Sequence, residues 1–192
     1  MTMPRLALLG LALVLPTAVQ AASWTLEEGS ALRFEAYQQG VAVEGRFERF
    51  DAAIDLDPEE LAEARIVVEI DTASIATGHK DRDTALRAPD LLDVAQWPTA
   101  RFASDRIEHL AGEAYQAAGR LTIRDVQKDV VLPFTLTITD HPGDPGLLRG
   151  EARGELTISR LAFGVGQGDW ASTAMVGENV VVRIEILATA PR

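Results

Sequence analysis

Most of this sequence alternates apolar and polar side chains with a period of two residues. The alternation is clearest in residues 32–37, 66–70, 115–124, 132–139 and 180–186. It is typical of β-strands that bury one face and expose the other. All such segments together predict eight or nine strands, and the short links between most of them allow neighbours to pair antiparallel. The sequence therefore predicts an all-β protein, either a sandwich or an up-and-down barrel.

The segment from Val41 to Leu56 favours the barrel, because it is long enough for a tilted strand that coils around a barrel axis. Its apolar residues occupy odd positions as far as Phe47 and even positions from Phe50 onward. A β-bulge between these two residues would keep one face apolar through the change of parity. Eight such strands enclose roughly the width of one ligand when the lining is not fully packed.

One long segment, Asp71–Phe102, lacks the alternation. Its first half is polar, with a turn at Gly78, and its second half spaces apolar residues roughly as a helix spaces a buried face. We expect a helical turn over 83–88 and a second one that Pro89 opens and Pro98 ends. A long excursion of this kind usually covers an opening, an edge or a binding site. We expect it to cover one end or flank of the barrel and to turn these side chains inward: Leu86, Leu91, Leu92 and Trp97.

The first 21 residues have the composition of a secretory signal peptide. Arg5 precedes an apolar run, Leu6–Leu15, that is shorter than the ~20 residues of a membrane span. Small residues then lead to a cleavage site before Ala22. We therefore expect an exported protein with one mature domain, residues 22–192, and the alternative is an uncleaved anchor.

The net charge of the chain is −11, and it becomes −12 when Arg5 is removed with the signal peptide. Such a chain repels nucleic acid and anionic lipid surfaces, so we expect no role with DNA or RNA or at a membrane surface. The sequence has no cysteine. This excludes disulfides, a cysteine nucleophile and thiolate metal ligands.

Residues with catalytic or metal-binding chemistry are scattered along the chain. His79, His109 and His141 lie in separate loops or strand ends, so we expect no metal site. No G-x-S-x-G motif marks a nucleophilic serine. The glycines of 164–168 lead to a final strand and not to a helix, which predicts a flexible hairpin loop in place of a phosphate-binding loop.

Asp83 and Arg160 are candidates for a structural ion pair. Parity places Arg160 on the inward face that Leu156 and Ile158 begin. A buried guanidinium needs a carboxylate, and Asp83 could supply it. Such a pair would fix the excursion over one barrel end; the alternative is that Asp83 lies in a solvated loop.

Five motifs cover nearly all of the mature chain. The most specific is R-D-T-A-L-R-A-P-D-L-L-D-V-A-Q-W-P-T-A-R-F-A-S at 82–104. The others are G-R-F-E-R-F at 45–50, I-D-T-A-S-I-A-T-G-H at 70–79, G-R-L-T-I-R-D-V-Q-K-D-V-V-L-P-F at 119–134 and S-R-L-A-F-G-V-G at 159–166. Together they resemble the YceI-like family, also called the lipocalin-like polyisoprenoid-binding domain.

The sequence also departs from the pattern of that family. The family usually has His at the position of Ala85, Gly at Asp125, and aromatic residues near Leu91 and Leu92. It often has Asn and Asp at the positions of Ser159 and Ala162. These departures concern the contacts of a ligand head group more than the fold.

The resemblance implies an extended, lipocalin-like antiparallel barrel in the periplasm, with an apolar tunnel. The tunnel would bind a long-chain amphiphile: a polyprenyl chain, an isoprenoid quinone or a fatty-acid-like molecule. It implies no catalytic activity and no cofactor other than such a bound lipid or quinone. Some family members are associated with cytochrome b-type membrane partners, and both such a partner and a homodimer are compatible with the resemblance.

We therefore predict a non-enzymatic carrier of a long isoprenoid lipid. Two alternatives stay open: a lipid-modifying hydrolase, which would need an acid–base pair inside the tunnel, and a structural or partner-binding module with a solid barrel. The predicted ligand-binding residues are apolar and inward-facing: Phe34, Phe47, Phe50, Ile66, Val68, Ile70, Leu91, Leu92, Phe102, Leu121, Ile123, Phe134, Leu136, Leu156, Ile158, Val182 and Ile184.

Overall fold

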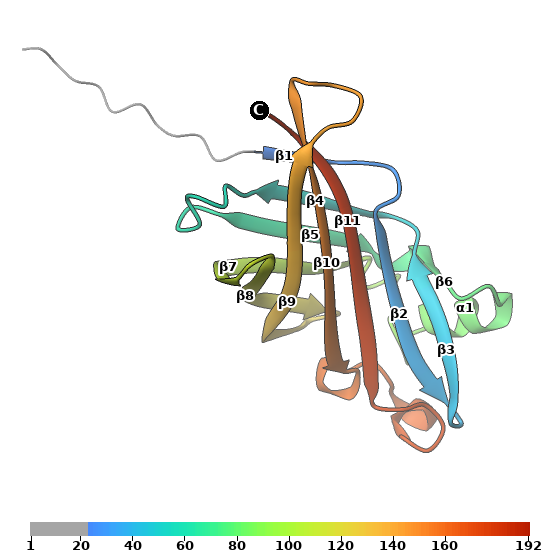
Figure 1. Ribbon diagram of the computed structural model, residues 1–192. Helices are drawn as coiled ribbons and strands as arrows, with labels where there is room; N and C mark the ends of the chain where they lie inside the picture. Colours follow the sequence, from blue (N-terminus) through green and yellow to red (C-terminus); the bar gives the residue numbers. More distant parts are fainter. Residues whose placement is uncertain (1–22) are drawn as a thin grey trace, which may run out of the picture.

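The structure is a computed structural model that describes residues 23–192, so the expected signal peptide and its cleavage site lie outside the described residues. The described residues are mostly β-strands, with one short α-helix (Figure 1). No helix among them is both long and apolar enough to cross a membrane. The strands are β1 (Ser23–Leu26), β2 (Ala31–Gln38), β3 (Val41–Phe47), β4 (Phe50–Asp55), β5 (Arg65–Asp71), β6 (Ile75–Ala76), β7 (Thr99–Ala111), β8 (Ala114–Ile123), β9 (Val126–Asp140), β10 (Leu147–Ser159) and β11 (Asn179–Pro191).

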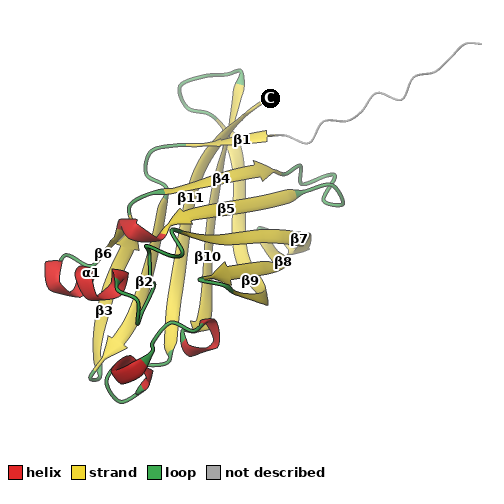
Figure 2. Ribbon diagram, turned by 180° about the vertical axis from the view of Figure 1, so that it is seen from behind, coloured by secondary structure: helices red, strands yellow, loops and turns green. Residues whose placement is uncertain are grey.

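These strands close into an eight-stranded antiparallel barrel, which confirms the all-β prediction and decides for the barrel over the sandwich. The ring runs β1-β4-β5-β7-β8-β9-β10-β11, and pairing of β1 with β11 closes it. Strands β2, β3 and β6 extend one side of the ring, because β2 pairs with the first part of β11 and β3 pairs with both β2 and β6. Short links join β4 to β5 and each of β7, β8 and β9 to the next strand, which gives this part of the ring the up-and-down order seen in Figure 2.

The change of parity between Phe47 and Phe50 coincides with the break between β3 and β4. The Glu48 N–H donates to the Ser74 carbonyl at 3.1 Å, and the Arg49 N–H donates to the Ser74 hydroxyl at 3.1 Å. These bonds satisfy backbone groups where the strand ladder is interrupted. The predicted β-bulge is therefore replaced by a two-residue break between the strands. The break has the same effect, because Phe47 and Phe50 both face the barrel interior.

The excursion lies on the flank of the barrel between β6 and β7, as expected (Figure 2). Its helix, α1 (Lys80–Arg87), contacts β6 and begins earlier than the predicted 83–88. The second helical turn predicted after Pro89 is wrong. Residues after Pro89 form isolated turns, and Asp93 adopts a left-handed φ of 49°, which a continuing helix does not allow.

Strands β9 and β10 separate along part of their length. Their ladder runs from Leu148 opposite Asp140 to Gly154 opposite Phe134, and it stops at Pro133, which has no N–H to donate. The short 3₁₀ helix η2 (Leu161–Phe163) contacts both strands beyond this point. Its Phe163 side chain is 2% exposed and joins the main apolar cluster. Here side-chain packing closes the barrel wall in place of hydrogen bonds.

Candidate binding cavity

The barrel interior contains a cavity of about 520 Å³. This volume falls within the range of about 300–1,000 Å³ typical of small-molecule sites. The cavity walls consist mainly of the inward apolar side chains of the barrel strands, and the excursion adds Leu86 to them. A solid barrel, one of the alternatives left open by the sequence, does not describe this structure.

Every residue that the sequence predicted to bind a ligand lines this cavity. The period-two alternation therefore assigned the inward faces correctly, and the helix-like spacing was right for Leu86, Leu91 and Leu92 of the excursion but not for Trp97. That these side chains contact a ligand stays a prediction. The residues are Phe34, Phe47, Phe50, Ile66, Val68, Ile70, Leu91, Leu92, Phe102, Leu121, Ile123, Phe134, Leu136, Leu156, Ile158, Val182 and Ile184.

Trp24 closes one end of the cavity. Its side chain is 6% exposed, and its Nε1–H donates to the Leu56 carbonyl at 2.8 Å. The ring lies against Gly150 of β10, where an added Cβ would come within 2.8 Å of the Trp24 Cζ3 atom. Ala188 of β11 is also buried at this end. Small residues on the neighbouring strands thus make room for one large ring, which packs the end of the barrel.

Tyr37 and Gln38, at the end of β2, line the cavity, and β2 ends at the tip of the molecule away from β1 (Figure 1). Among the lining residues in the described part of the chain, Tyr37 of β2 and Asp81 of α1 are the exposed ones. The lining here also becomes more polar, with Gln38, Arg82 and Arg160. The cavity is therefore asymmetric, with an apolar closed end and a more polar open end.

Arg160 organises the loop between β10 and β11. Its side chain donates from Nε to the Gly177 carbonyl at 2.9 Å, from Nη1 to the Val165 carbonyl at 2.9 Å, and from Nη2 to the Val176 carbonyl at 2.8 Å. Arg160 is 4% exposed, and this burial lowers its pKa from the ordinary arginine value, against a weaker opposing effect of Glu178. The guanidinium thus joins two parts of the loop, Val165 and the consecutive residues Val176 and Gly177.

The predicted ion pair between Asp83 and Arg160 is wrong. Asp83 Oδ1 accepts hydrogen bonds from the Thr77 N–H at 2.8 Å and the Thr77 hydroxyl at 2.6 Å. Burial alone would raise the pKa of Asp83, but these bonds and the nearby charges of Arg87 and Arg82 together outweigh it, and the pKa lies below the ordinary value. The prediction assumed that a buried guanidinium needs a carboxylate, whereas backbone carbonyls also satisfy its N–H groups.

Two arginines hold the excursion through backbone carbonyls, Arg87 within the excursion itself and Arg124 from the barrel. Arg87 donates to the carbonyls of Ala73 and Ile75 at 2.8 and 2.6 Å. Arg124 donates to the carbonyls of Pro89, at 3.0 Å, and Leu91. The guanidinium of Arg124 also lies 4.3 Å from the ring centroid of Trp97. This contact explains why Trp97, which was predicted to turn inward, does not line the cavity: its ring pairs with a cation instead.

The three histidines lie apart. His79 precedes α1, His109 stacks on Tyr115 with ring centroids 4.7 Å apart, and His141 lies 3.4 Å from a Glu27 carboxylate oxygen. Within residues 23–192, no three His, Asp or Glu side chains come together in a way that could hold a metal ion.

Several residues that line the cavity were not predicted from the sequence. Leu32 and Ile54 continue inward faces that were already assigned, so their parity could have identified them. Trp24 lies in a four-residue strand that is too short to show alternation. Trp170 and Val176 belong to the loop that Arg160 holds, and the sequence pattern gives no sign that this loop lines the cavity.

Comparison with known proteins identifies relatives of the whole described fold. The YceI-like domain family matches residues 24–188. A UPF0312 protein of Shewanella denitrificans is 32% identical over 179 residues, which is 91% of this chain and 93% of that protein.

Two solved structures share the fold. The crystal structure of Burkholderia cenocepacia BcnA matches with a TM-score of 0.76 and 28% identity, over 85% of this chain and 99% of that one. A structure described as a polyisoprenoid binding domain from Saccharophagus degradans, implicated in plant cell wall breakdown, matches with a TM-score of 0.63 over 90% of this chain and 99% of that one. At 18% identity, the second likeness shows the fold alone.

Proposed function

This chain belongs to the YceI-like domain family, and we propose that it is a non-enzymatic carrier that holds one long-chain isoprenoid lipid in its barrel cavity. The observation that carries this proposal is the cavity of about 520 Å³, which is lined almost entirely by apolar side chains and open at one end. A polyprenyl chain or the tail of an isoprenoid quinone is the class of ligand that suits such a space. The Saccharophagus degradans domain, described as polyisoprenoid-binding, supports the choice.

The energetics of such a site need few polar contacts. Each buried methylene contributes about 0.8 kcal/mol, so one isoprene unit of about five carbons contributes ~3–4 kcal/mol. A few units therefore offset an association cost of ~4–15 kcal/mol. The more polar open end, with Gln38, Arg82 and Arg160, is where the ligand head group would lie.

The residues that line the cavity also give no support to the hydrolase alternative. Within the described part of the chain, Asp81 is the one carboxylate that lines the cavity, and no histidine lines it. No observation favours an acid–base pair there, so the carrier is the better proposal. We also propose a periplasmic location, which the signal-like composition of residues 1–21 supports. A cytochrome b-type partner and a homodimer remain predictions.

Mass spectrometry of lipid extracted from the purified, denatured protein tests the carrier directly. The chain offers a matched pair of variants in β4, where Ala52 lines the cavity and its neighbour Ala53 is exposed. We expect Ala52→Phe to fill part of the cavity and to retain several-fold less lipid than the wild type. Ala53→Phe should retain the wild-type amount. A protein that carries no lipid and takes up no added polyprenol, or equal retention by the two variants, would contradict the proposal.

A further inference from the structure

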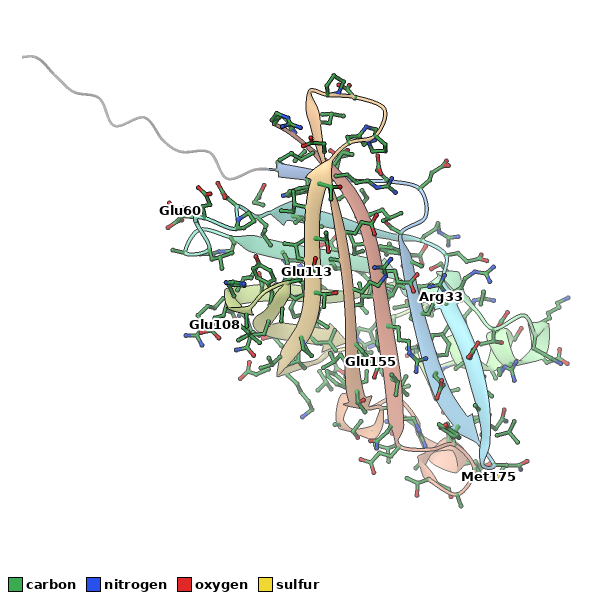
Figure 3. All side chains as sticks on the ribbon, in the orientation of Figure 1. Arg33, Glu60, Glu108, Glu113, Glu155 and Met175 are labelled. Atoms are coloured by element: carbon green, nitrogen blue, oxygen red, sulfur yellow. The ribbon has the colours of Figure 1, made fainter. Side chains whose placement is uncertain are left out.

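Three of the large apolar side chains that the described structure leaves exposed lie at one tip of the molecule. Tyr37 is 47% exposed, Val41 66% and Met175 45%. Tyr37 and Val41 flank the turn between β2 and β3, and Met175 comes from the loop between β10 and β11 (Figure 3). We call the β2–β3 turn and this loop, residues 36–43 and 167–177, the apolar tip.

The two segments of the apolar tip are joined by backbone hydrogen bonds. The Gln39 N–H donates to the Met175 carbonyl at 3.0 Å, and the Gly177 N–H donates to the Tyr37 carbonyl at 2.7 Å. Gln38 also pairs with Val176 in an isolated antiparallel bridge. The exposed side chains are therefore presented by one connected structure, and not by two independent loops.

The apolar tip borders the open end of the cavity. Tyr37, Trp170 and Val176 line the cavity and belong to the tip, and Arg160 holds the carbonyls of Val176 and Gly177 from inside. A ligand that moves through this opening would pass the exposed apolar side chains. Of the five large apolar residues with such exposure, Tyr37 is the one that lines the cavity, and Val41 and Met175 lie in the two tip segments beside it, whereas Leu110 and Val131 lie outside the tip.

The tip also differs from the rest of the chain in charge. Residues of the types Asp, Glu, Lys and Arg make up 24% of the sequence, yet residues 36–43 contain none and residues 167–177 contain only Asp169. The net charge of −11, which led us to expect no role at a membrane surface, is thus carried elsewhere. Charge repulsion acts on anionic lipids and is weak for a tip with a single charge at a zwitterionic surface.

We propose that the apolar tip docks on the surface of a lipid bilayer and inserts Val41, Met175 and the ring of Tyr37 among the acyl chains. Burial of apolar side chains in the interface drives this kind of binding, and it needs no basic residues when the lipids are zwitterionic. The cavity opening then faces the bilayer, so an isoprenoid lipid passes between membrane and barrel without crossing water. The transfer step rests on the proposed carrier function; the docking step does not.

Docking can be measured on the protein alone, because the chain has no cysteine and accepts a single labelled one. An environment-sensitive fluorophore is attached to Val41→Cys and, as a control, to Leu110→Cys, and each protein is mixed with phosphatidylcholine vesicles. We expect a blue shift at position 41 that persists in high salt, and none at position 110. No shift at position 41, or an equal shift at both positions, would overturn the proposal. So would a shift that requires vesicles containing membrane proteins, since this would indicate a protein partner.

Transfer of a fluorescent polyprenyl lipid between donor and acceptor vesicles tests the consequence. Val41→Asp combined with Met175→Asp should slow transfer at least tenfold and leave binding of the same lipid in detergent unchanged. Leu110→Asp combined with Val131→Asp should leave both unchanged. Equal slowing by both pairs would contradict docking through the tip. If the wild type shows the position-41 shift but binds no lipid in detergent, the carrier proposal fails and docking stands.

Discussion

At the Trp24 end of the cavity, the barrel is closed by a large ring packed against small residues, whereas at the Tyr37 end it is bounded by a loop that one arginine holds through backbone carbonyls. The first arrangement depends on shape, and Trp24 cannot move without leaving a void next to Gly150. The second depends on hydrogen bonds from the buried Arg160 side chain to a loop whose residues 171–175 are exposed, and water can replace these bonds when the loop shifts. We call the Trp24 end of the cavity the floor and the Tyr37 end, with the loop that Arg160 holds, the rim. The floor is fixed by packing, and the rim can adapt.

The largest effect is expected from Trp24→Ala, which removes the floor. Loss of a buried tryptophan costs about 3–5 kcal/mol of unfolding free energy, and this variant also loses the hydrogen bond to the Leu56 carbonyl. Urea denaturation gives the value. Trp97→Ala is the control, because that ring lies outside the cavity against Arg124, and its loss should be clearly smaller. Equal losses would mean that the Trp24 end is no more tightly packed than the excursion.

Arg160→Met should rank second, with a loss of about 2–4 kcal/mol. The substitution leaves the carbonyls of Val165, Val176 and Gly177 without their donor. The loss stays moderate because a loosened loop lets water reach these groups. Arg33→Met removes an exposed ion pair with Glu185 and should change stability by about 0–1 kcal/mol.

The Arg160 variant also tests the rejected ion pair. Since Asp83 bonds to Thr77 and not to Arg160, the losses in Arg160→Met and Asp83→Ala should add in the double variant. A coupling of about 1 kcal/mol or more would restore the predicted ion pair and make the rim less adaptable than we argue.

Gly150→Ala is a smaller disturbance of the floor. The added methyl group would lie 2.8 Å from the Trp24 ring, so ring or strand must shift, at a cost of about 1–3 kcal/mol. Gly143→Ala is the matched control, because Gly143 is exposed in a loop and a Cβ there would lie at an ordinary 3.5 Å from His141. Thermal denaturation should separate the two variants. A Gly150 variant as stable as its control would show that the floor has free space.

The walls of this cavity were predictable from the sequence, and its two ends were not. Alternation identifies inward residues such as Ile66 and Val68 because a strand has a period of two, whatever its neighbours are. The fit of Gly150 to Trp24 is a property of two strands that are far apart in the chain, and neither residue shows it alone. The start of α1 was placed too late because His79 makes no capping hydrogen bond through its side chain.

Arg160 shows that the hydrogen-bond partners of a polar group are also hard to predict from the sequence. Its parity placed it correctly on the inward face, but its partners are carbonyls, which every residue has. Only the path of the loop decides which carbonyls point at the guanidinium. A search for a side-chain partner therefore found Asp83, the wrong residue.

The smallest expected effect is the pH dependence of the stability that Asp83 contributes to the flank of the barrel. The pKa of Asp83 is lowered in the folded protein, because hydrogen bonds from Thr77 and the charges of Arg87 and Arg82 together outweigh the effect of burial. The carboxylate therefore adds stability that is fully present above the unfolded pKa of about 4, and this stability is lost as the pH falls through the lower folded pKa. The stability difference between wild type and Asp83→Asn should accordingly shrink from pH 7 to pH 3, by less than the Gly150→Ala effect. Asp129→Asn, exposed on β9, is the control. A difference that stays constant with pH would mean that the Asp83–Thr77 contact stabilises the flank through shape alone, as Trp24 does at the floor.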